Sequence, residues 1–203
     1  MVLEVALIDV IPGTEDEFAA SAKDVWVAGT RTTVDGRQLG LILHWDGLRW
    51  TPAKLPGRDD QTLQGIAGTG SDVWAVGSTC AKAAGPATCA ALALHLVDGV
   101  WQIVPSSTGV SLTGVFAFRP DDVWVVGQNN SPIALRLDHV EHWDGRRFTV
   151  DTTVAAPVPP LINGGLSSLV PLAAVAGDRQ SGVIWAVGWV GSAIRSTHAV
   201  YRH

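Results

Sequence analysis

The feature that most constrains the fold is a six-residue stretch that the chain repeats. It reads DVWVAG at 24–29, DVWAVG at 72–77, DVWVVG at 122–127 and, in a weaker form, VIWAVG at 183–188. In the third copy Val123 and Val125 alternate with Trp124 and Val126, so both faces of an extended strand would be apolar. Such a strand must be covered on both sides. Self-similarity at this spacing predicts a repeat architecture before any single residue is considered.

A second motif recurs in step with the first. It reads LILHWDGLRW at 41–50, LALHLVDGVW at 92–101 and HVEHWDGRRF at 139–148. An Asp-Gly pair between two apolar runs is typical of a two-residue hairpin, because both positions of a type I′ turn need positive φ. We therefore expect three such hairpins, at Asp46-Gly47, Asp98-Gly99 and Asp144-Gly145.

Four antiparallel strands in a repeat of this length are typical of a propeller blade. The sequence therefore predicts an all-β protein, a β-propeller of about four blades at about 14–56, 57–107, 108–155 and 166–203. Over about 18–203 these repeats resemble the DVWAVG-type blades of bacterial proteins related to the kelch, galactose-oxidase and Asp-box propellers. The chain ends at 199–203, where another copy of the second motif would be starting, and its first 20 residues are unlike the repeats. We expect a propeller that is incomplete at both ends.

Residues 1–20 allow two interpretations. MVLEVALIDVIPGTEDEF predicts a strand over 3–11, a Pro-Gly turn, and an acidic helix with Thr14 as its N-cap. Over about 1–18 this segment resembles the start of the antibiotic biosynthesis monooxygenase family, which implies a small cofactor-independent monooxygenase. Alternatively, 17–20 aligns with 115–118 and would form the end of the first blade's inner strand. Helix, strand and grafted segment all remain open.

Charge and composition exclude several classes of function. The chain has 14 Lys+Arg against 19 Asp+Glu, with a net charge of −5 and no basic stripe, which argues against nucleic-acid binding. No apolar run approaches the ~18 residues that a membrane span needs. The start of the chain lacks the basic residues of a signal peptide.

The two cysteines, Cys80 and Cys89, fall in one expected loop. A disulfide between them would indicate an extracytoplasmic protein. The alternative is a pair of free thiols in an alanine-rich insertion.

Loop length predicts where a ligand would bind. The loop between the second and third strands varies among the repeats, and the connection at 149–171 is longest. In a propeller these two classes of loop share one rim, and variable loops on a rigid scaffold often carry function. The predicted contact loops are 30–40, 78–91, 128–138 and 150–171. The candidate ligand-face residues are Arg31, Asp35, Arg37, Asn129, Asn130, Trp189 and Arg195.

Two repeated polar positions have both a structural and a functional interpretation. Three histidines occupy equivalent third-strand positions, namely His44, His95 and His142. A metal site is conceivable, but third strands lie away from a propeller axis, so we expect hydrogen bonds within the hairpin or to a neighbouring strand. Three aspartates end the turn before each DVW stretch, namely Asp24, Asp72 and Asp122. We expect them to accept backbone N–H bonds.

Catalysis has weak support in the sequence. Asp59 and Asp60 could act as the acid and base of a glycosidase, but neighbours in one loop rarely face each other across a substrate. We expect a solvated turn there. The chain shows no nucleophile triad, phosphate loop or metal-ligand cluster, and we expect no cofactor.

The resulting hypothesis is a non-catalytic propeller-type binding module for a glycan or a protein. The first alternative is the monooxygenase implied by residues 1–18. The second is a truncated propeller with no activity of its own, whose incomplete blades would promote self-association.

Overall fold

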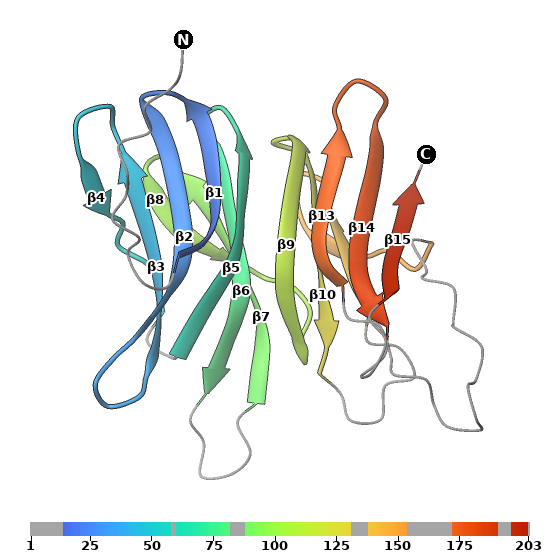
Figure 1. Cartoon of the computed structure of the whole chain (residues 1–203), viewed down its shortest axis with the longest axis horizontal. Helices are drawn as coiled ribbons and strands as arrows, with labels where there is room; N and C mark the ends of the chain where they lie inside the picture. Colours follow the sequence, from blue (N-terminus) through green and yellow to red (C-terminus); the bar gives the residue numbers. More distant parts are fainter. Residues whose placement is uncertain are drawn as a thin grey trace.

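The protein is all-β in the part that its structure describes. The computed structural model describes residues 14–57, 60–81, 88–130, 138–153, 172–190 and 196–202. Within these ranges the regular secondary structure consists of β-strands, and the strands form four antiparallel sheets (Figure 1). The all-β prediction is confirmed. No helix long and apolar enough to cross a membrane occurs within these ranges.

Each sheet is built from strands that follow one another in the chain and pair in that order. Sheet 1 contains β1 (Thr14–Ser21), β2 (Asp24–Thr32), β3 (Gln38–Trp45) and β4 (Trp50–Pro52). Sheet 2 contains β5 (Asp60–Thr69), β6 (Asp72–Ala81), β7 (Thr88–Val97) and β8 (Val100–Val104). Sheet 3 contains β9 (Val110–Arg119), β10 (Asp122–Asn129), β11 (Asp138–Trp143) and β12 (Phe148–Val150). Sheet 4 contains β13 (Leu172–Asp178), β14 (Val183–Val190) and β15 (Ser196–Arg202).

The four sheets pack face to face in chain order. One apolar cluster joins sheets 1 and 2, a second joins sheets 2 and 3, and a third joins sheets 3 and 4. Sheets 1 and 4 lie at opposite ends of the stack, shown in blue and in orange-red in Figure 1. The described residues therefore form an open stack of sheets and show no closed propeller ring.

The second strand of each inner sheet is apolar on both faces, as the repeat predicts. On β6, Trp74 and Val76 pack against sheet 3, while Val73 and Ala75 pack against sheet 1. All four side chains are fully buried. The corresponding Trp185 of β14 is 42% exposed. Its exposure is consistent with its position on the last sheet of the stack.

In sheets 2 and 3, the glycine that ends the DVW stretch allows a close approach of two strands. A Cβ atom added to Gly77 would lie 1.8 Å from the carbonyl oxygen of Thr62, and one added to Gly127 would lie 2.1 Å from that of Ser111. Both glycines lie next to an irregularity in the pairing of the first and second strands. Any side chain at these positions would force the strands apart.

The helix expected from Thr14 is wrong, because these residues form strand β1. Phe18 pairs with Trp26 as Phe116 pairs with Trp124, so the alternative alignment of 17–20 with 115–118 is correct. The Oδ2 atom of Asp16 accepts the backbone N–H of Ile66 at 2.8 Å, which ties β1 to sheet 2. Tertiary packing thus outweighs the local helix signals. The expected strand over 3–11 lies outside the described residues.

The three Asp-Gly turns are not alike. Asp98 and Gly99 have φ values of +50° and +77° and join β7 to β8 in the predicted two-residue turn. The prediction is wrong for 46–47 and 144–145, where four residues separate the paired strand ends. The Asp46 carboxylate accepts the N–H groups of Leu48 and Arg49 at 2.8 and 2.9 Å and so stabilises a longer loop.

The loop at 144–147 is stabilised in the same way. Asp144 accepts the N–H groups of Arg146 and Arg147, both at 2.9 Å. These backbone bonds, with that of Arg147 first, lower the pKa of Asp144, as the bonds from Arg49 and Leu48 lower the pKa of Asp46.

Cys80 and Cys89 form a disulfide in the structure. They are directly paired residues of β6 and β7, with Cα atoms 4.1 Å apart. The disulfide therefore links the two strands next to the loop that connects them.

Candidate functional site

A triplet of Asp, Trp and His side chains recurs in the first three sheets. The aspartate begins the second strand, the tryptophan follows two residues later, and the histidine lies opposite the tryptophan on the third strand. The Asp–Trp–His triplets are Asp24–Trp26–His44, Asp72–Trp74–His95 and Asp122–Trp124–His142. The Asp-to-Trp Nε1 distances are 2.9, 3.0 and 3.0 Å, in that order. The Asp-to-His Nε2 distances are 2.8, 2.9 and 2.9 Å.

The triplets hold the second and third strands together. The carboxylate accepts two hydrogen bonds, and Nε2 of each histidine is the donor because a carboxylate can only accept. Each imidazole also stacks on its indole, with ring centroids 3.9, 3.9 and 4.3 Å apart in sheets 1, 2 and 3. The expected cross-strand role of the histidines is confirmed. The expected backbone partners of the aspartates are wrong, because the indole and imidazole take their place.

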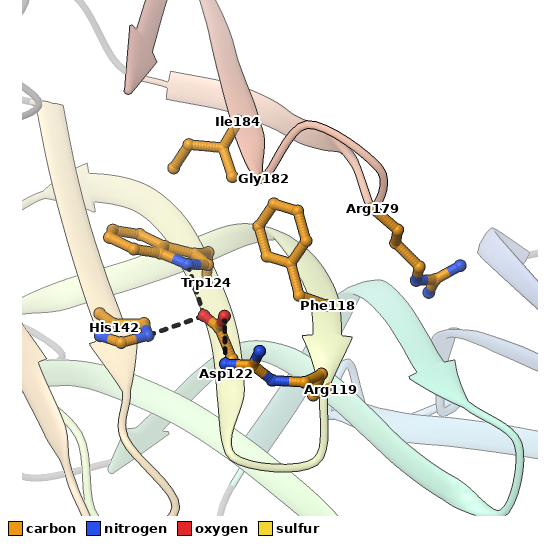
Figure 2. Close-up of a pocket in the computed structure, with 8 residues that line it drawn as sticks. All are labelled: Phe118, Arg119, Asp122, Trp124, His142, Arg179, Gly182 and Ile184. Atoms are coloured by element: carbon orange, nitrogen blue, oxygen red, sulfur yellow. Dashed lines mark hydrogen bonds and ion pairs between the residues drawn. The ribbon is translucent and has the colours of Figure 1, made fainter. Parts of the chain in front are cut away.

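A groove opens beside the third triplet, between sheets 3 and 4 (Figure 2). Its volume is about 350 Å³, within the size range of small-ligand sites. The turn between β9 and β10 and the turn between β13 and β14 lie at this end of the strands. The residues that line the groove are Phe118, Arg119, Asp122, Trp124, His142, Arg179, Gly182 and Ile184.

The groove combines an aromatic wall with a polar rim. Trp124 is buried, Phe118 is half-buried, and both rings border the hollow in Figure 2. Phe118 lies at a break in the pairing of β9 with β10, between Ala117 and Arg119. In sheet 2 the equivalent pairs are consecutive, because Gly68 pairs with Val73 and Thr69 pairs with Asp72. Sheet 2 therefore has no residue equivalent to Phe118. The irregularity therefore gives sheet 3 an aromatic side chain that sheet 2 lacks.

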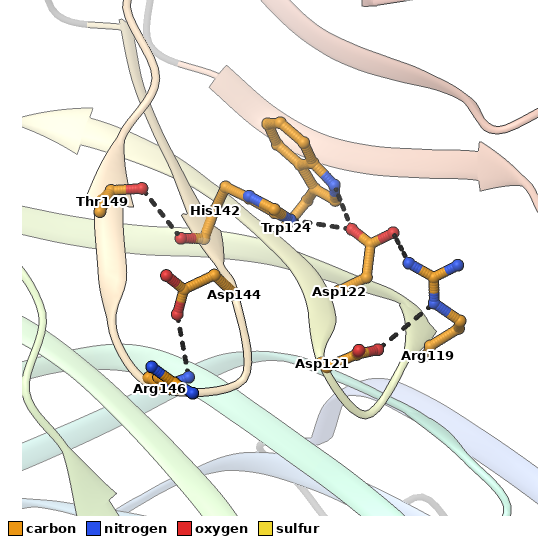
Figure 3. A network of polar contacts seen from close by, with 8 residues as sticks. All are labelled: Arg119, Asp121, Asp122, Trp124, His142, Asp144, Arg146 and Thr149. Carbon is orange, nitrogen blue, oxygen red and sulfur yellow. Dashed lines mark hydrogen bonds and ion pairs between the residues drawn. The ribbon is translucent and has the colours of Figure 1, made fainter.

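The charged groups of the groove are held by neighbours. Asp122 accepts from Trp124 and His142 through Oδ1 and from Arg119 through Oδ2 at 3.2 Å (Figure 3). Arg119 also pairs with Asp121 at 3.3 Å. With three donors on its carboxylate, Asp122 is arranged as a structural acceptor. This arrangement does not resemble a general acid or base poised to exchange protons.

Arg179 closes the groove toward the inner strands. In Figure 2 its side chain points away from Trp124. Its guanidinium donates to the carbonyl oxygens of Gly68 at 3.0 Å and of Ala117 at 2.9 Å, and it lies 5.3 Å from the Phe116 ring centroid. One side chain from sheet 4 thus bonds to the backbone of sheets 2 and 3, which fixes the position of this wall.

The predicted ligand-face residues lie at the other end of the strands. Arg31, Asp35 and Arg37 belong to the β2–β3 hairpin of sheet 1, while Asn129 ends β10 in sheet 3 and Asn130 follows it. Sheet 2 separates these two groups, so the structure does not bring them together. The backbone of Trp189 lies in β14, and Arg195 lies outside the described residues.

The structure describes one of the two aspartates that were considered for catalysis. Asp60 pairs with Nε of Arg37 at 3.2 Å and has a mostly buried side chain. Asp59 is not described. Asp60 therefore anchors the β2–β3 hairpin to β5.

Sequence reasoning missed a buried glutamate and its hydrogen-bond partners between sheets 2 and 3. Glu141 of β11 is 1% exposed and stands opposite Val125, at the position that Leu43 and Leu94 occupy in sheets 1 and 2. Its carboxylate accepts from Nε2 of His139 at 2.6 Å, from Oγ of Ser106 at 2.9 and 3.0 Å, and from the N–H of Ser107 at 3.2 Å.

The serine in this cluster is not an activated nucleophile. A nucleophilic serine donates its proton to a histidine, whereas Ser106 donates to the carboxylate itself. The sequence signal was a charged residue at an apolar repeat position. Among the described residues, no group of three or more His, Cys, Asp or Glu side chains is placed to hold a metal ion.

Comparisons with known proteins give limited information. No protein-family model and no curated protein sequence matches the chain. Fifteen chains of solved structures match. Among them is the xylan β-1,4-xylosidase of Bacillus halodurans C-125, with 10% identity and a TM-score of 0.36. The match covers 96% of this chain and 53% of the xylosidase chain, so this chain spans about half of that neighbour's length. A likeness at this level does not assign an activity.

Proposed function

We propose that this chain is a propeller-type, non-catalytic binding module, whose ligand is a glycan or a protein held in the groove between sheets 3 and 4. The observation that carries this proposal is the groove itself. It has the volume of a ligand site and borders two aromatic rings. Aromatic walls with a few fixed polar groups are the usual composition of binding pockets.

The arrangement of charges favours binding over catalysis. Asp122 is fully engaged by the indole, the imidazole and a guanidinium, and Arg179 is engaged by backbone carbonyls. Groups held in this way are poorly placed to exchange a proton with a substrate. The rim predicted from loop length remains a second candidate surface, and the experiment below separates it from the groove.

The disulfide between Cys80 and Cys89 is consistent with an extracellular location. An extracellular binding module would meet glycans and protein surfaces. The monooxygenase alternative loses the helix that it required at residue 14, because that segment is a strand of sheet 1.

Thermal unfolding in the presence of oligosaccharides and peptides tests the proposal. A ligand at 100 times its Kd stabilises the folded state by about 2.7 kcal/mol, which raises the Tm of a chain of this size by about 5–10 °C. We expect such a shift with no product formed during prolonged incubation. Steady hydrolysis of any oligosaccharide would show that the module is an enzyme.

Two matched substitutions locate the ligand. Phe118→Lys places a charge on the groove wall, whereas Val150→Lys places one on an exposed residue of β12, which does not line the groove. We expect Phe118→Lys to abolish the shift and Val150→Lys to keep it. If Phe118→Lys keeps the shift and Arg31→Ala on the β2–β3 hairpin abolishes it, the ligand binds the opposite rim.

A further inference from the structure

Sheet 2 ends in an apolar strand whose outer edge is open in the described part of the structure. This strand, β8, pairs with β7 on one side, and no described strand pairs with its other side. Its five residues, VWQIV, carry no charge, and Val100 and Ile103 are 60% and 51% exposed. An exposed, uncharged strand edge of this kind is a template for pairing with another chain.

The outer strands of sheets 1 and 3 are better protected against such pairing. In β4, Pro52 occupies a paired position, and a proline has no N–H to offer a further strand. In β12 only three residues are extended, and the charged residues Arg147 and Asp151 flank them. Short strands, prolines and charges all discourage edge-to-edge pairing. Of these three outer strands, β8 is therefore the one most open to a partner.

The turn before β8 determines which backbone groups face outward. Val100 follows a two-residue turn with positive φ at both positions, and the residues that flank such a turn form a hydrogen-bonded pair. Hydrogen-bonded pairs alternate along an antiparallel ladder, so Val100, Gln102 and Val104 direct their backbone groups toward β7. Trp101 and Ile103 direct theirs toward the open edge. This edge therefore offers two N–H groups and two carbonyl oxygens.

The sequence of β8 is complementary to itself when two copies run antiparallel. With a two-fold axis at Gln102, Trp101 lies opposite Ile103 of the second copy, and Val100 lies opposite Val104 of the second copy. Trp101 and Ile103 would exchange both of their outward backbone bonds, and symmetry repeats this pair. The exposed isoleucine would gain an aromatic neighbour, a type of cross-strand pair that stabilises sheets.

We propose that β8 is a dimerisation edge, at which two copies of this chain pair antiparallel and join their second sheets into one continuous sheet. The contact uses the same residues of both copies, so it closes as a dimer and does not extend into a filament. Pro105 follows β8 directly and has no N–H, which limits the pairing to the strand itself. The groove between sheets 3 and 4 takes no part in this contact.

Sedimentation equilibrium of the intact protein measures the association. We expect a monomer–dimer equilibrium, and an interface with a Kd of only about 100 µM would place most of the protein in dimers at about 1 mM. Ile103→Lys puts a charge beside the Trp101 ring of the second copy and should remove the dimer. Val150→Lys is the matched control, because Val150 is also about half exposed on an outer strand, and this variant should still form dimers.

Charge variants of Gln102 test the position of the two-fold axis. Gln102 is exposed and would lie opposite its own equivalent in the second copy. Gln102→Lys and Gln102→Glu each place like charges opposite one another, so each protein alone should be monomeric. An equimolar mixture of the two pairs opposite charges and should form a heterodimer. A folding defect could not produce this rescue, and far-UV circular dichroism verifies that each variant is folded.

Amide hydrogen exchange identifies the edge that is used. The amides of Trp101 and Ile103 should exchange more slowly as the protein concentration rises, because they become bonded to the second copy. A protein that remains monomeric at the highest concentration overturns the proposal. A dimer that persists in both Gln102 variants, or a mixture of them that stays monomeric, also overturns it. None of these results depends on ligand binding in the groove, so the proposed function is tested separately.

Discussion

Replacement of Glu141 by leucine tests whether a buried charge stabilises this stack of sheets. The substitution restores the residue type found at the equivalent positions Leu43 and Leu94. Packing alone would predict a more stable protein, because burial of a leucine side chain contributes about 1.5–3 kcal/mol. The hydrogen bonds of Glu141 predict the opposite result.

The magnitude follows from the partners of the carboxylate. Without it, the Ser106 hydroxyl, the Ser107 N–H and the His139 ring nitrogen each lose an acceptor. A buried donor left unsatisfied costs about 1–3 kcal/mol, and the serines are half-buried, so water offsets part of this cost. After the gain from leucine, we expect Glu141→Leu to lower the free energy of unfolding by about 1–3 kcal/mol.

Urea unfolding followed by tryptophan fluorescence measures this change. Glu141→Gln is the matched control, since it keeps the shape and one acceptor but removes the charge. We expect it to cost about 1–2 kcal/mol, because charge-assisted hydrogen bonds are stronger than neutral ones. A Glu141→Leu protein as stable as the parent, or more stable, would refute the reasoning.

The same carboxylate predicts a pH dependence. Burial raises the pKa of Glu141, but the hydrogen bonds from His139, Ser107 and Ser106 together hold the pKa below its ordinary value. The ionised form therefore stabilises the fold above the unfolded-state pKa, and this contribution disappears as the pH falls through the lower folded-state pKa. We expect the stability difference between the parent and Glu141→Gln to be full at pH 7 and to shrink below about pH 4.5.

Two further substitutions and the reduction of the disulfide test other parts of the fold. Gly77→Ala should prevent folding or cost more than about 3 kcal/mol, because its Cβ would clash with the Thr62 carbonyl, and circular dichroism reports the loss. Reduction of the Cys80–Cys89 disulfide should lower the free energy of unfolding by about 2–3 kcal/mol in urea titrations with and without dithiothreitol. Asp72→Asn should cost about 1–2 kcal/mol in the same titrations, because one of its two donors loses a charged acceptor.

The sequence was most informative where the repeat is apolar. The alternation of Val73 and Trp74 predicted a strand buried on both faces, and the structure places both at 0% exposure. Burial periodicity is a local property, so it can be read without knowing which sheet lies opposite. The alignment of 17–20 with 115–118 succeeded because it followed the spacing of the repeat, although local signals favoured a helix.

The polar contacts were harder to predict because they depend on register. Asp122 and His142 lie 20 residues apart, across a hairpin whose length the repeat does not determine. The sequence therefore did not indicate that both side chains contact the Trp124 indole. Backbone partners were predicted for the aspartates instead. Asp46 and Asp98 have the same local motif, but side-chain bonds to the following N–H groups lengthen one loop and not the other.

The groove could not be predicted from either motif. It lies between sheets 3 and 4, and its lining combines residues of two turns with Trp124 and His142. Loop length instead indicated the opposite rim, where Arg31 and Asn129 lie on sheets that sheet 2 separates. Variation in loop length shows which loops tolerate insertions, whereas the groove arises from the packing of one sheet against the next.

Hydrogen exchange of the tryptophan indoles tests the central claim most directly, namely that each DVW stretch is a packing element fixed by its triplet. Trp26, Trp74 and Trp124 donate their indole N–H to aspartates, while Trp185 is 42% exposed on the last sheet. In ¹⁵N-resolved spectra of protein transferred to D₂O, the account predicts slow exchange for these three indoles and rapid exchange for Trp185. Similar rates for all four would contradict it.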